Sequence, residues 1–386
     1  MSNRWCLAGA LRFAAGLLAA WCVLFIAAPA SAMPIFAQRY HLRCSACHTA
    51  LPELNEMGNY FRDHGYRLPP GAEKHGTTVV ALRYNNEWEN DPASGSRRFT
   101  GSSSLLAQED IGAVSAYVHY GLGSGGAPSS FYLGFLSTYN AHTKELWRLG
   151  LFELPLTQSP GQRLDTIQEY GYFGTSVGQN DLDLNAPRLG LETERQVGAV
   201  KLSGTLAFGE FKGAAYGGAP VFTGATTTAA RPELGLYARL PINSFINVNA
   251  QILDGERKIA LPGRAPFDDD YDRLGYGADF FFFQKRLDLT AQQWLGRDND
   301  PDGADDALDS SGGYLRLKYF LTPHLFVSSR YDTAANPFPN RSFINDIGAL
   351  VFNHARIVLE RRVDLIRGTP TYGGYLTVAG PWAIGY

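Results

Sequence analysis

The sequence predicts an all-β fold, a transmembrane antiparallel β-barrel of about sixteen strands that follows a short helical segment at the N-terminus. Three observations support this prediction. Apolar and polar residues alternate over short segments, and most segments are close to the roughly 10 residues that a tilted membrane-spanning strand needs. The connections between the segments also alternate between short and long.

The alternation is clearest in the middle of the chain. From Ile246 to Ile252 every second residue is apolar and the residues between them are Asn or Gln, and a similar pattern runs from Val200 to Phe208. Each such strand has one apolar and one polar face. The pattern is typical of a soluble β-sandwich as well as of a membrane barrel, so alternation alone leaves both open.

The lengths and spacings of the segments favour the barrel. The expected strands cover 79–88, 110–120, 130–138, 145–154, 165–176, 187–195, 198–209, 232–240, 244–253, 271–283, 286–296, 312–321, 323–332, 345–353, 356–363 and 372–386. Short turns are expected near 196–197, 241–243, 284–285, 322 and 354–355, and longer connections at 210–231, 254–270, 297–311 and 333–344. Outer-membrane barrels have an even number of strands, short periplasmic turns and long external loops, so we expect this barrel to begin and end on the periplasmic side.

The aromatic residues agree with a barrel over 77–386 in a bacterial outer membrane. They make up 13% of the sequence, and the chain ends in an aromatic-rich stretch from Trp382 to Tyr386. Aromatic side chains gather at both edges of the apolar band of membrane barrels.

The first 32 residues are typical of a cleaved secretory signal peptide. Arg4 and Arg12 precede an apolar run that ends near Ala28, and the small residues 30–32 match a signal-peptidase site. The alternative is an uncleaved anchor, but the run is shorter than the roughly 20 residues of a spanning helix. Removing residues 1–32 takes the net charge from −3 to −5, and a chain with this mild negative charge and no basic stripe is not expected to bind nucleic acid.

The motif Cys44-Ser45-Ala46-Cys47-His48 predicts one covalently attached c-type haem. After removal of the signal peptide these two cysteines are the only ones in the sequence. Their thiols would bond the two vinyl groups of the porphyrin, and the adjacent histidine would then reach the iron as an axial ligand. The alternative is a redox-active Cys-x-x-Cys pair, which needs a strand before the motif and a long helix after it, and the sequence has neither pattern.

A helix is expected over 52–64, with Leu54, Met57, Phe61 and His64 on one face. That face would pack on the porphyrin or, alternatively, on the barrel.

The second axial ligand is less well defined by the sequence. Met57 is a candidate because a thioether is a common haem ligand and this is the only methionine after Met33. His41, His64 and His75 compete with it, and an open coordination position is a further alternative.

The expected monohaem segment, 33–76, is too small to shield a haem unaided. We therefore expect the barrel to shelter it.

Several of these segments resemble a known family. The stretches 36–38 (FAQ), 44–49 (CSACHT), 52–55 (PELN) and 58–66 (GNYFRDHGY) look like the N-terminal segment of the fused monohaem cytochrome-porins, the outer-membrane iron(II) oxidases of iron-oxidising bacteria. The segments 152–156 (FELPL) and 186–192 (APRLGLE) are similar to parts of that family's barrel.

The resemblance implies a haem segment held in or beneath the barrel lumen. An extracellular donor such as Fe(II) would give up an electron, which would pass by the haem to a periplasmic c-type cytochrome. Such an iron(II) oxidase needs no general base or nucleophile. Two alternatives stay open: electron export to an extracellular acceptor, and a transport porin whose haem is structural.

One external loop has the spacing of a calcium site. Asp298, Asp300, Asp302 and Asp309, with Gly303 at the turn, occupy positions of a calcium-binding loop. Two other interpretations remain: the carboxylates attract Fe(II) to the barrel mouth, or they form a solvated acidic loop.

Overall fold

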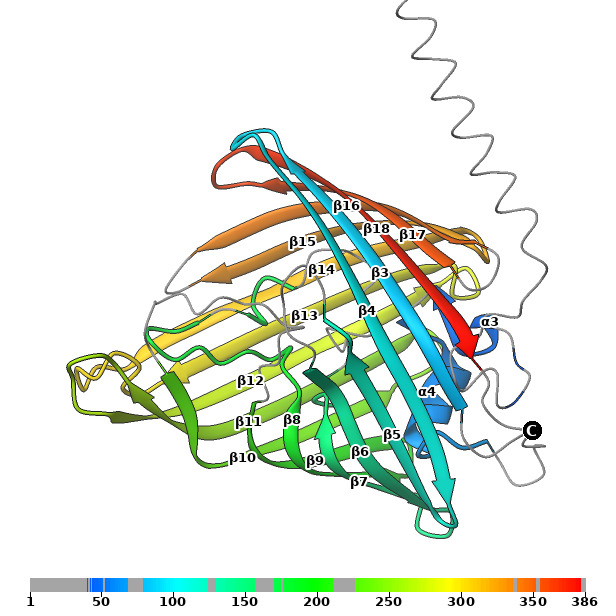
Figure 1. The fold of residues 1–386 in the computed structure, drawn as a ribbon, viewed down its shortest axis with the longest axis horizontal. Helices are drawn as coiled ribbons and strands as arrows, with labels where there is room; N and C mark the ends of the chain where they lie inside the picture. The colour runs from blue at the N-terminus through cyan, green and yellow to red at the C-terminus, as the bar shows by residue number, and fades with distance from the viewer. Residues whose placement is uncertain are drawn as a thin grey trace, which may run out of the picture.

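The computed structural model describes residues 40, 42, 44–50, 53–68, 79–123, 130–156, 170–174, 176–210, 226–335, 339–351 and 355–382. Within these residues, sixteen antiparallel strands form a closed barrel in which the last strand pairs with the first (Figure 1). The strands are β3 (Val79–Asp91), β4 (Ser96–Ile111), β5 (Val114–Gly121), β6 (Ser130–Asn140), β7 (Glu145–Phe152), β8 (Arg188–Val197), β9 (Val200–Glu210), β10 (Thr226–Pro241), β11 (Ile246–Ala260), β12 (Phe267–Phe282), β13 (Leu287–Asp298), β14 (Leu308–Thr322), β15 (Leu325–Ala335), β16 (Asn340–Val351), β17 (Ala355–Asp364) and β18 (Thr369–Trp382). The predicted signal peptide lies outside the described residues.

The barrel has apolar side chains outside and polar side chains inside. On β14, Arg316 and Lys318 are fully buried, whereas Leu315 and Leu317 between and beside them are 49% and 45% exposed. A soluble sandwich would bury the leucines and expose the cations, so the barrel prediction is confirmed. Among the described residues, no helix has the length and apolar character needed to cross a bilayer.

The two ends of the barrel differ. At the short-turn end, pairs of strands are joined at 112–113, 141–144, 198–199, 242–245, 283–286, 323–324 and 352–354. At the long-loop end the connections include 153–187, 211–225 and 299–307. Gly112 and Gly198 have positive φ angles, which the tightest turns at the short-turn end require.

The strand count is confirmed, but two of the individual predictions behind it are wrong. The described part of 165–176 forms no barrel strand, and a strand that was not expected, β4, covers 96–111. Several strands are also longer than expected: β11 and β12 occupy most of 254–270, which was predicted as a loop.

The segment 153–187, here called the inward loop, explains the first error. Its described residues run into the lumen (Figure 1) and are largely buried there. Tyr170, Tyr172 and Phe173 pack with Trp294 and Tyr314 of the barrel wall in a hydrophobic cluster. The aromatic residues of this segment therefore belong to a loop that packs inside the lumen rather than to a barrel strand.

The N-terminal segment lies at the short-turn end (Figure 1). It consists of α3 (Cys44–Cys47), β1 (His48–Ala50), β2 (Glu53–Leu54) and α4 (Glu56–Asp63). The helix begins later than predicted because the Asn55 side chain caps it, accepting a hydrogen bond from the Gly58 amide at 2.9 Å. Leu54 therefore precedes the helix, and Met57 is 38% exposed whereas Phe61 is buried, so these residues do not share one buried face.

Candidate functional site

The Cys-x-x-Cys-His motif forms one helical turn followed directly by β1. Helix α3 separates Cys44 from Cys47 by three residues, which is close to one turn, and His48 is the first residue of the strand. Cys47 and His48 are half-buried. Burial raises the pKa of the Cys47 thiol, so this group is a neutral thiol at neutral pH.

The motif is fixed against the start of α4. The Asn55 backbone amide donates to the Cys47 carbonyl oxygen at 2.9 Å, and the Asn55 side chain donates to the Ala46 carbonyl oxygen at 3.0 Å. A Cβ atom at Gly58 would lie 2.0 Å from the same Cys47 oxygen. Only glycine permits this close approach, so α4 holds the backbone of the motif in place.

These residues fit the attachment of a c-type haem. The backbones of the two cysteines lie one turn apart on a single short helix, and the histidine follows directly. The residues at the start of α4 contact the backbone of the motif from one side. The Cys44 side chain is outside the described residues.

The candidates for the second axial ligand have different surroundings. Met57 is partly exposed on α4. The His64 ring stacks on Tyr60 with 3.7 Å between ring centroids and contacts Tyr139 at 4.3 Å. Its Nδ1 donates to the Tyr60 carbonyl oxygen at 2.6 Å, which leaves the proton off Nε2. His41 and His75 lie outside the described residues.

Ion pairs attach the N-terminal segment to the short-turn end of the barrel. Lys201 of β9 lies 2.6 Å from Asp63 and 3.0 Å from Glu194, so it bridges α4 and the inner wall. Lys285, in the turn between β12 and β13, pairs with Glu56.

The chain after α4 then enters the lumen. Tyr66, which has a left-handed φ of 62°, stacks on Tyr117 and Phe135 of the barrel wall with centroid distances of 5.7 and 5.8 Å. Arg148 lies over the rings of Tyr66 and Phe135 and forms a buried ion pair with Glu192. Because a non-glycine residue is strained at positive φ, this aromatic packing must offset the strain.

Next to Tyr66, Arg67 donates from Nε to the Ser115 hydroxyl at 3.0 Å and lies 3.6 Å from Asp110. Both partners are at the short-turn ends of β4 and β5. The segment is thus held by the rim and by the inner wall together.

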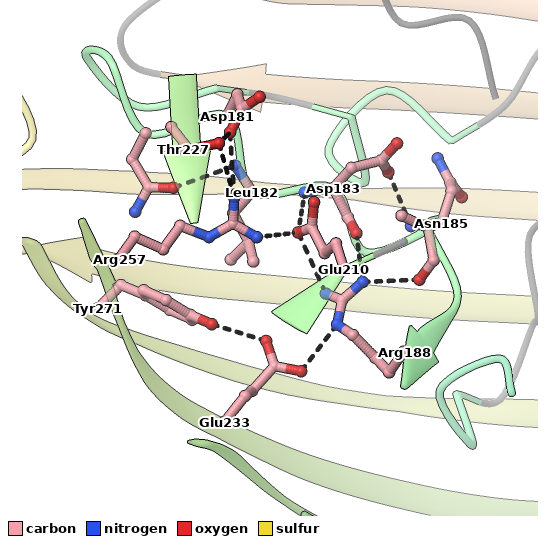
Figure 2. A network of polar contacts seen from close by, with 12 residues as sticks. Asp181, Leu182, Asp183, Asn185, Arg188, Glu210, Thr227, Glu233, Arg257 and Tyr271 are labelled. Carbon is pink, nitrogen blue, oxygen red and sulfur yellow. Dashed lines mark hydrogen bonds and ion pairs between the residues drawn. The ribbon is translucent and has the colours of Figure 1, made fainter. Parts of the chain in front are cut away.

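A second polar network holds the inward loop inside the lumen (Figure 2). Arg188, which is fully buried, donates to Glu233 at 2.8 Å, to the Ala186 carbonyl oxygen at 2.6 Å and to the Asp183 carbonyl oxygen at 3.0 Å. It also lies 3.4 Å from Glu210. The arginine therefore ties the end of the loop to β9 and β10.

The network continues along the wall. Arg257 of β11 pairs with Asp181 of the loop at 3.0 Å and also with Glu210 (Figure 2). Tyr271 of β12 donates to Glu233 at 2.7 Å. Two buried arginines and two buried glutamates thus neutralise one another, which is the condition under which buried charges are tolerated.

Asn180 fixes the far side of the inward loop. Its side-chain amide donates to Asp269 at 2.7 Å and to Asp298 at 3.0 Å. Asp298 also pairs with Arg273 at 2.8 Å. In the middle of the loop, the Tyr170 ring stacks on Tyr314 with 4.0 Å between ring centroids and lies beneath Arg330.

The structure does not bring the four aspartates of the predicted calcium loop together. Asp298 points into the lumen, whereas Asp309 is exposed and pairs with Arg297 at 3.5 Å. Asp300 caps its own turn by accepting hydrogen bonds from the amides of residues 304 and 305. Asp302 lies beside Gly178 of the inward loop. In the part of the chain that is described, no three His, Cys, Asp or Glu side chains are arranged to hold a metal ion.

Sequence reasoning missed the residues that hold the two lumenal segments. Arg188, Glu233 and Arg257 lie in strands at inward-facing positions, where an outer-membrane barrel has polar residues in any case. The signal that could have found them is the full charge at inward-facing positions, because a buried charge needs a partner of opposite charge. On the inner wall, Nε2 of His119 lies 3.0 Å from the Arg83 guanidinium.

No protein-family model and no curated protein matches this sequence. Solved structures do share its fold. An anion-selective porin from Comamonas acidovorans superposes with a TM-score of 0.58 at 14% identity, covering 80% of this chain and 100% of the porin. OmpF of Salmonella typhi in complex with daunomycin superposes with a TM-score of 0.58 at 8% identity, covering 79% of this chain and 98% of OmpF. The outer-membrane channel DcaP of Acinetobacter baumannii superposes with a TM-score of 0.55 at 11% identity, covering 78% of this chain and 96% of DcaP. The chain therefore has the closed sixteen-strand fold of porins.

Proposed function

We propose that this protein is an electron-transfer cytochrome-porin of the bacterial outer membrane. It carries one haem c on Cys44, Cys47 and His48, takes electrons from an extracellular donor, most simply Fe(II), and delivers them to a periplasmic c-type cytochrome. The membrane location follows from the apolar outer face and polar inner face of a closed barrel.

One observation carries the proposal: the Cys-x-x-Cys-His motif is part of a segment that docks on the short-turn end of the barrel. This end is periplasmic in outer-membrane barrels, so a haem attached here would face a soluble periplasmic acceptor. Lys201, Tyr66 and Arg67 hold the segment there. When bound, the haem supplies one-electron oxidation and reduction at its iron.

The chain's own residues have two tasks in this function. Asn55 and Gly58 position the backbone of the attachment motif. The inward loop, held by Arg188 and Arg257, fills part of the lumen and restricts the passage of water and solutes. Electrons tunnel through packed protein, whereas solutes need an open path. A partly filled lumen therefore favours electron transfer over solute transport.

The direct test uses the purified full-length protein from a host that attaches haem c. We expect a haem absorption spectrum that survives denaturation, which shows covalent attachment, and reduction of the haem bands when Fe(II) is added. The Cys44→Ala/Cys47→Ala variant should retain the barrel and lose both signals. If the wild type holds no covalent haem, the proposal is wrong.

A second measurement separates this function from its alternatives. Liposomes that contain the protein should show little solute flux, whereas a transport porin with a structural haem would conduct well. Haem that is not reduced by Fe(II), but is rapidly oxidised by an extracellular acceptor such as Fe(III) citrate, would instead indicate electron export.

A further inference from the structure

Four outward-facing residues form a continuous row across the barrel wall near the long-loop end. The strand register pairs Arg361 with Tyr372, Tyr372 with Asn90, and Asn90 with Arg97. Directly paired residues point to the same face of a sheet, and Arg361, Tyr372 and Arg97 are exposed. We call these four residues the basic row.

An aromatic layer lies directly below the basic row, toward the short-turn end. The next outward-facing positions are Leu359, Gly374, Trp88 and Phe99, again paired in this order. A Cβ atom on Gly374 would lie 1.9 Å from Nε1 of Trp88, so the indole ring lies over this glycine. Trp88 and Phe99 are 42% and 73% exposed.

The order of residues along the outer face matches a membrane interface. Exposed Ile357 lies furthest below the row, Leu359 shares the layer of the aromatic pair, and the arginines come last. Aromatic side chains mark the headgroup level of a bilayer, and basic residues just beyond them meet anionic headgroups. A shallow groove of about 390 Å³ lies at this level of the β3–β4 hairpin, and residues of both its faces line it: Trp88, Glu89, Asn90, Arg97, Arg98 and Phe99.

The arginines of the basic row differ from their sequence neighbours. Arg98 and Arg362 face the other side of the same strands and pair with Glu89 at 3.0 and 3.5 Å. Arg97 and Arg361, among the residues that the structure describes, form no ion pair with a carboxylate. The inner face thus neutralises its cations within the protein, whereas the outer face leaves two cations for an external anion.

We propose that the basic row binds the phosphate groups of an anionic glycolipid in the outer leaflet. The proposal rests on the membrane location and orientation given above. A lipid is the favoured ligand because the row continues a lipid-facing surface, and guanidinium groups bind phosphate through paired hydrogen bonds. The two arginines lie three strand spacings apart, about 14 Å between backbones, which suits a headgroup that carries two phosphates.

Binding of diphosphoryl lipid A to the full-length protein in detergent tests this proposal. Native mass spectrometry should show the lipid bound to the wild type, and the Arg97→Gln/Arg361→Gln variant should bind about 25-fold more weakly, at roughly five-fold per arginine. Arg195→Gln is the matched control, because Arg195 is exposed at the short-turn end and pairs with Glu145. It should bind as the wild type does.

Two further arms identify the source of the phosphate. Dephosphorylated lipid A should bind as weakly to the wild type as the diphosphoryl form binds to the double variant. Inorganic phosphate at the same concentration should not compete. Equal binding of lipid A to the wild type and to the double variant would overturn the proposal, as would full competition by inorganic phosphate.

The outcome is separable from that of the proposed function. Insertion into liposomes tests the membrane location, and the haem spectrum tests the cofactor. If the protein inserts into liposomes but its binding of lipid A does not depend on the phosphates, only the proposal for the basic row is wrong.

Discussion

The barrel holds two further segments, the inward loop inside the lumen and the N-terminal segment at the short-turn end, in different ways. The inward loop is fixed by buried ion pairs of Arg188 and Arg257, both of which are almost inaccessible to solvent. The N-terminal segment is fixed by Lys201, Lys285 and Arg67, which are partly exposed, and by the aromatic stack around Tyr66. Buried pairs are costly to break, whereas exposed pairs contribute little.

This difference indicates that the loop is a permanent part of the barrel and that the N-terminal segment is a docked one. The loop is flanked by β7 and β8, so it cannot leave the barrel entirely. The N-terminal segment is attached to the barrel strands on one side only, through the connection to β3. We expect the barrel to fold without the docked segment, and the segment to depend on the barrel and, under the proposed function, on a bound haem for order.

Removing the central arginine of the loop network should have the largest effect. Arg188→Met leaves Glu233 buried without its bonded cation, which we expect to destabilise the folded protein by about 3–5 kcal/mol. The inward loop should then leave the lumen, so single-channel conductance in planar bilayers should rise as the midpoint of urea unfolding falls. Arg195→Gln, at an exposed pair, should change neither. Unchanged conductance in Arg188→Met would show that other contacts hold the loop.

Removing the Tyr66 ring should have the next largest effect, and it should weaken only the docking of the N-terminal segment. Tyr66→Ala removes the stack on Tyr117 and Phe135, which we expect to weaken docking by about 2–3 kcal/mol. Trypsin should then cleave faster after Arg67 in the native protein, while the urea midpoint of the barrel stays constant. Tyr84→Ala, on the outer face, is the control. A shifted urea midpoint in Tyr66→Ala would contradict the separation between docking and barrel stability.

Lys201 and Lys285 at the rim should contribute different amounts to the free energy of docking. Lys201→Ala leaves the buried Glu194 without its cation and should weaken docking by about 1–2 kcal/mol. Lys285→Ala breaks a pair whose partner, Glu56, is 86% exposed, so the loss should stay below about 0.5 kcal/mol. The same trypsin assay compares them. Equal effects would mean that burial does not control the strength of this interface.

Acidification should have the smallest effect. Burial lowers the pKa of His64, although the Tyr60 carbonyl oxygen and Asp63 favour its charged form and Lys201 opposes it. The docked state therefore binds a proton less readily than the undocked state, whose histidine has its ordinary value of about 6.5. Docking should weaken as the pH falls below that value and stay constant above it. His64→Gln should abolish this dependence, and a variant that keeps it would assign the effect to another group.

The sequence predicted the barrel and its number of strands. The number was right only because the missed strand at 96–111 was balanced by the false strand at 165–176. Segment 96–111 contains four consecutive polar or small residues from Gly101 to Ser104, which resemble a loop because neither face is apolar there. The inward loop has aromatic residues at alternate positions, which resemble a strand. Periodicity reports alternation between two environments, and it does not report which environments these are.

The Cys-x-x-Cys-His motif is visible in the sequence, whereas the contacts that hold it in place are not. Cys44, Cys47 and His48 are contiguous, so their spacing is visible in the chain. The residues that dock the segment, such as Lys201 and Tyr117, are brought near it only by closure of the barrel. The spacing of Asp298, Asp300, Asp302 and Asp309 matched a calcium loop, yet strand β13 turns the first of them inward while β14 carries the last on the outer face.

The pairing of β3 with β18 has a consequence for assembly. These strands come from opposite ends of the barrel sequence, so the wall has two open edges until the last strand arrives. Contacts between such distant parts of a chain form slowly. The N-terminal segment precedes β3 and is available throughout this time, so the ring must close around or beside it. Because the barrel is expected to fold without the docked segment, substitutions that disturb docking should leave the yield of correctly closed barrels unchanged.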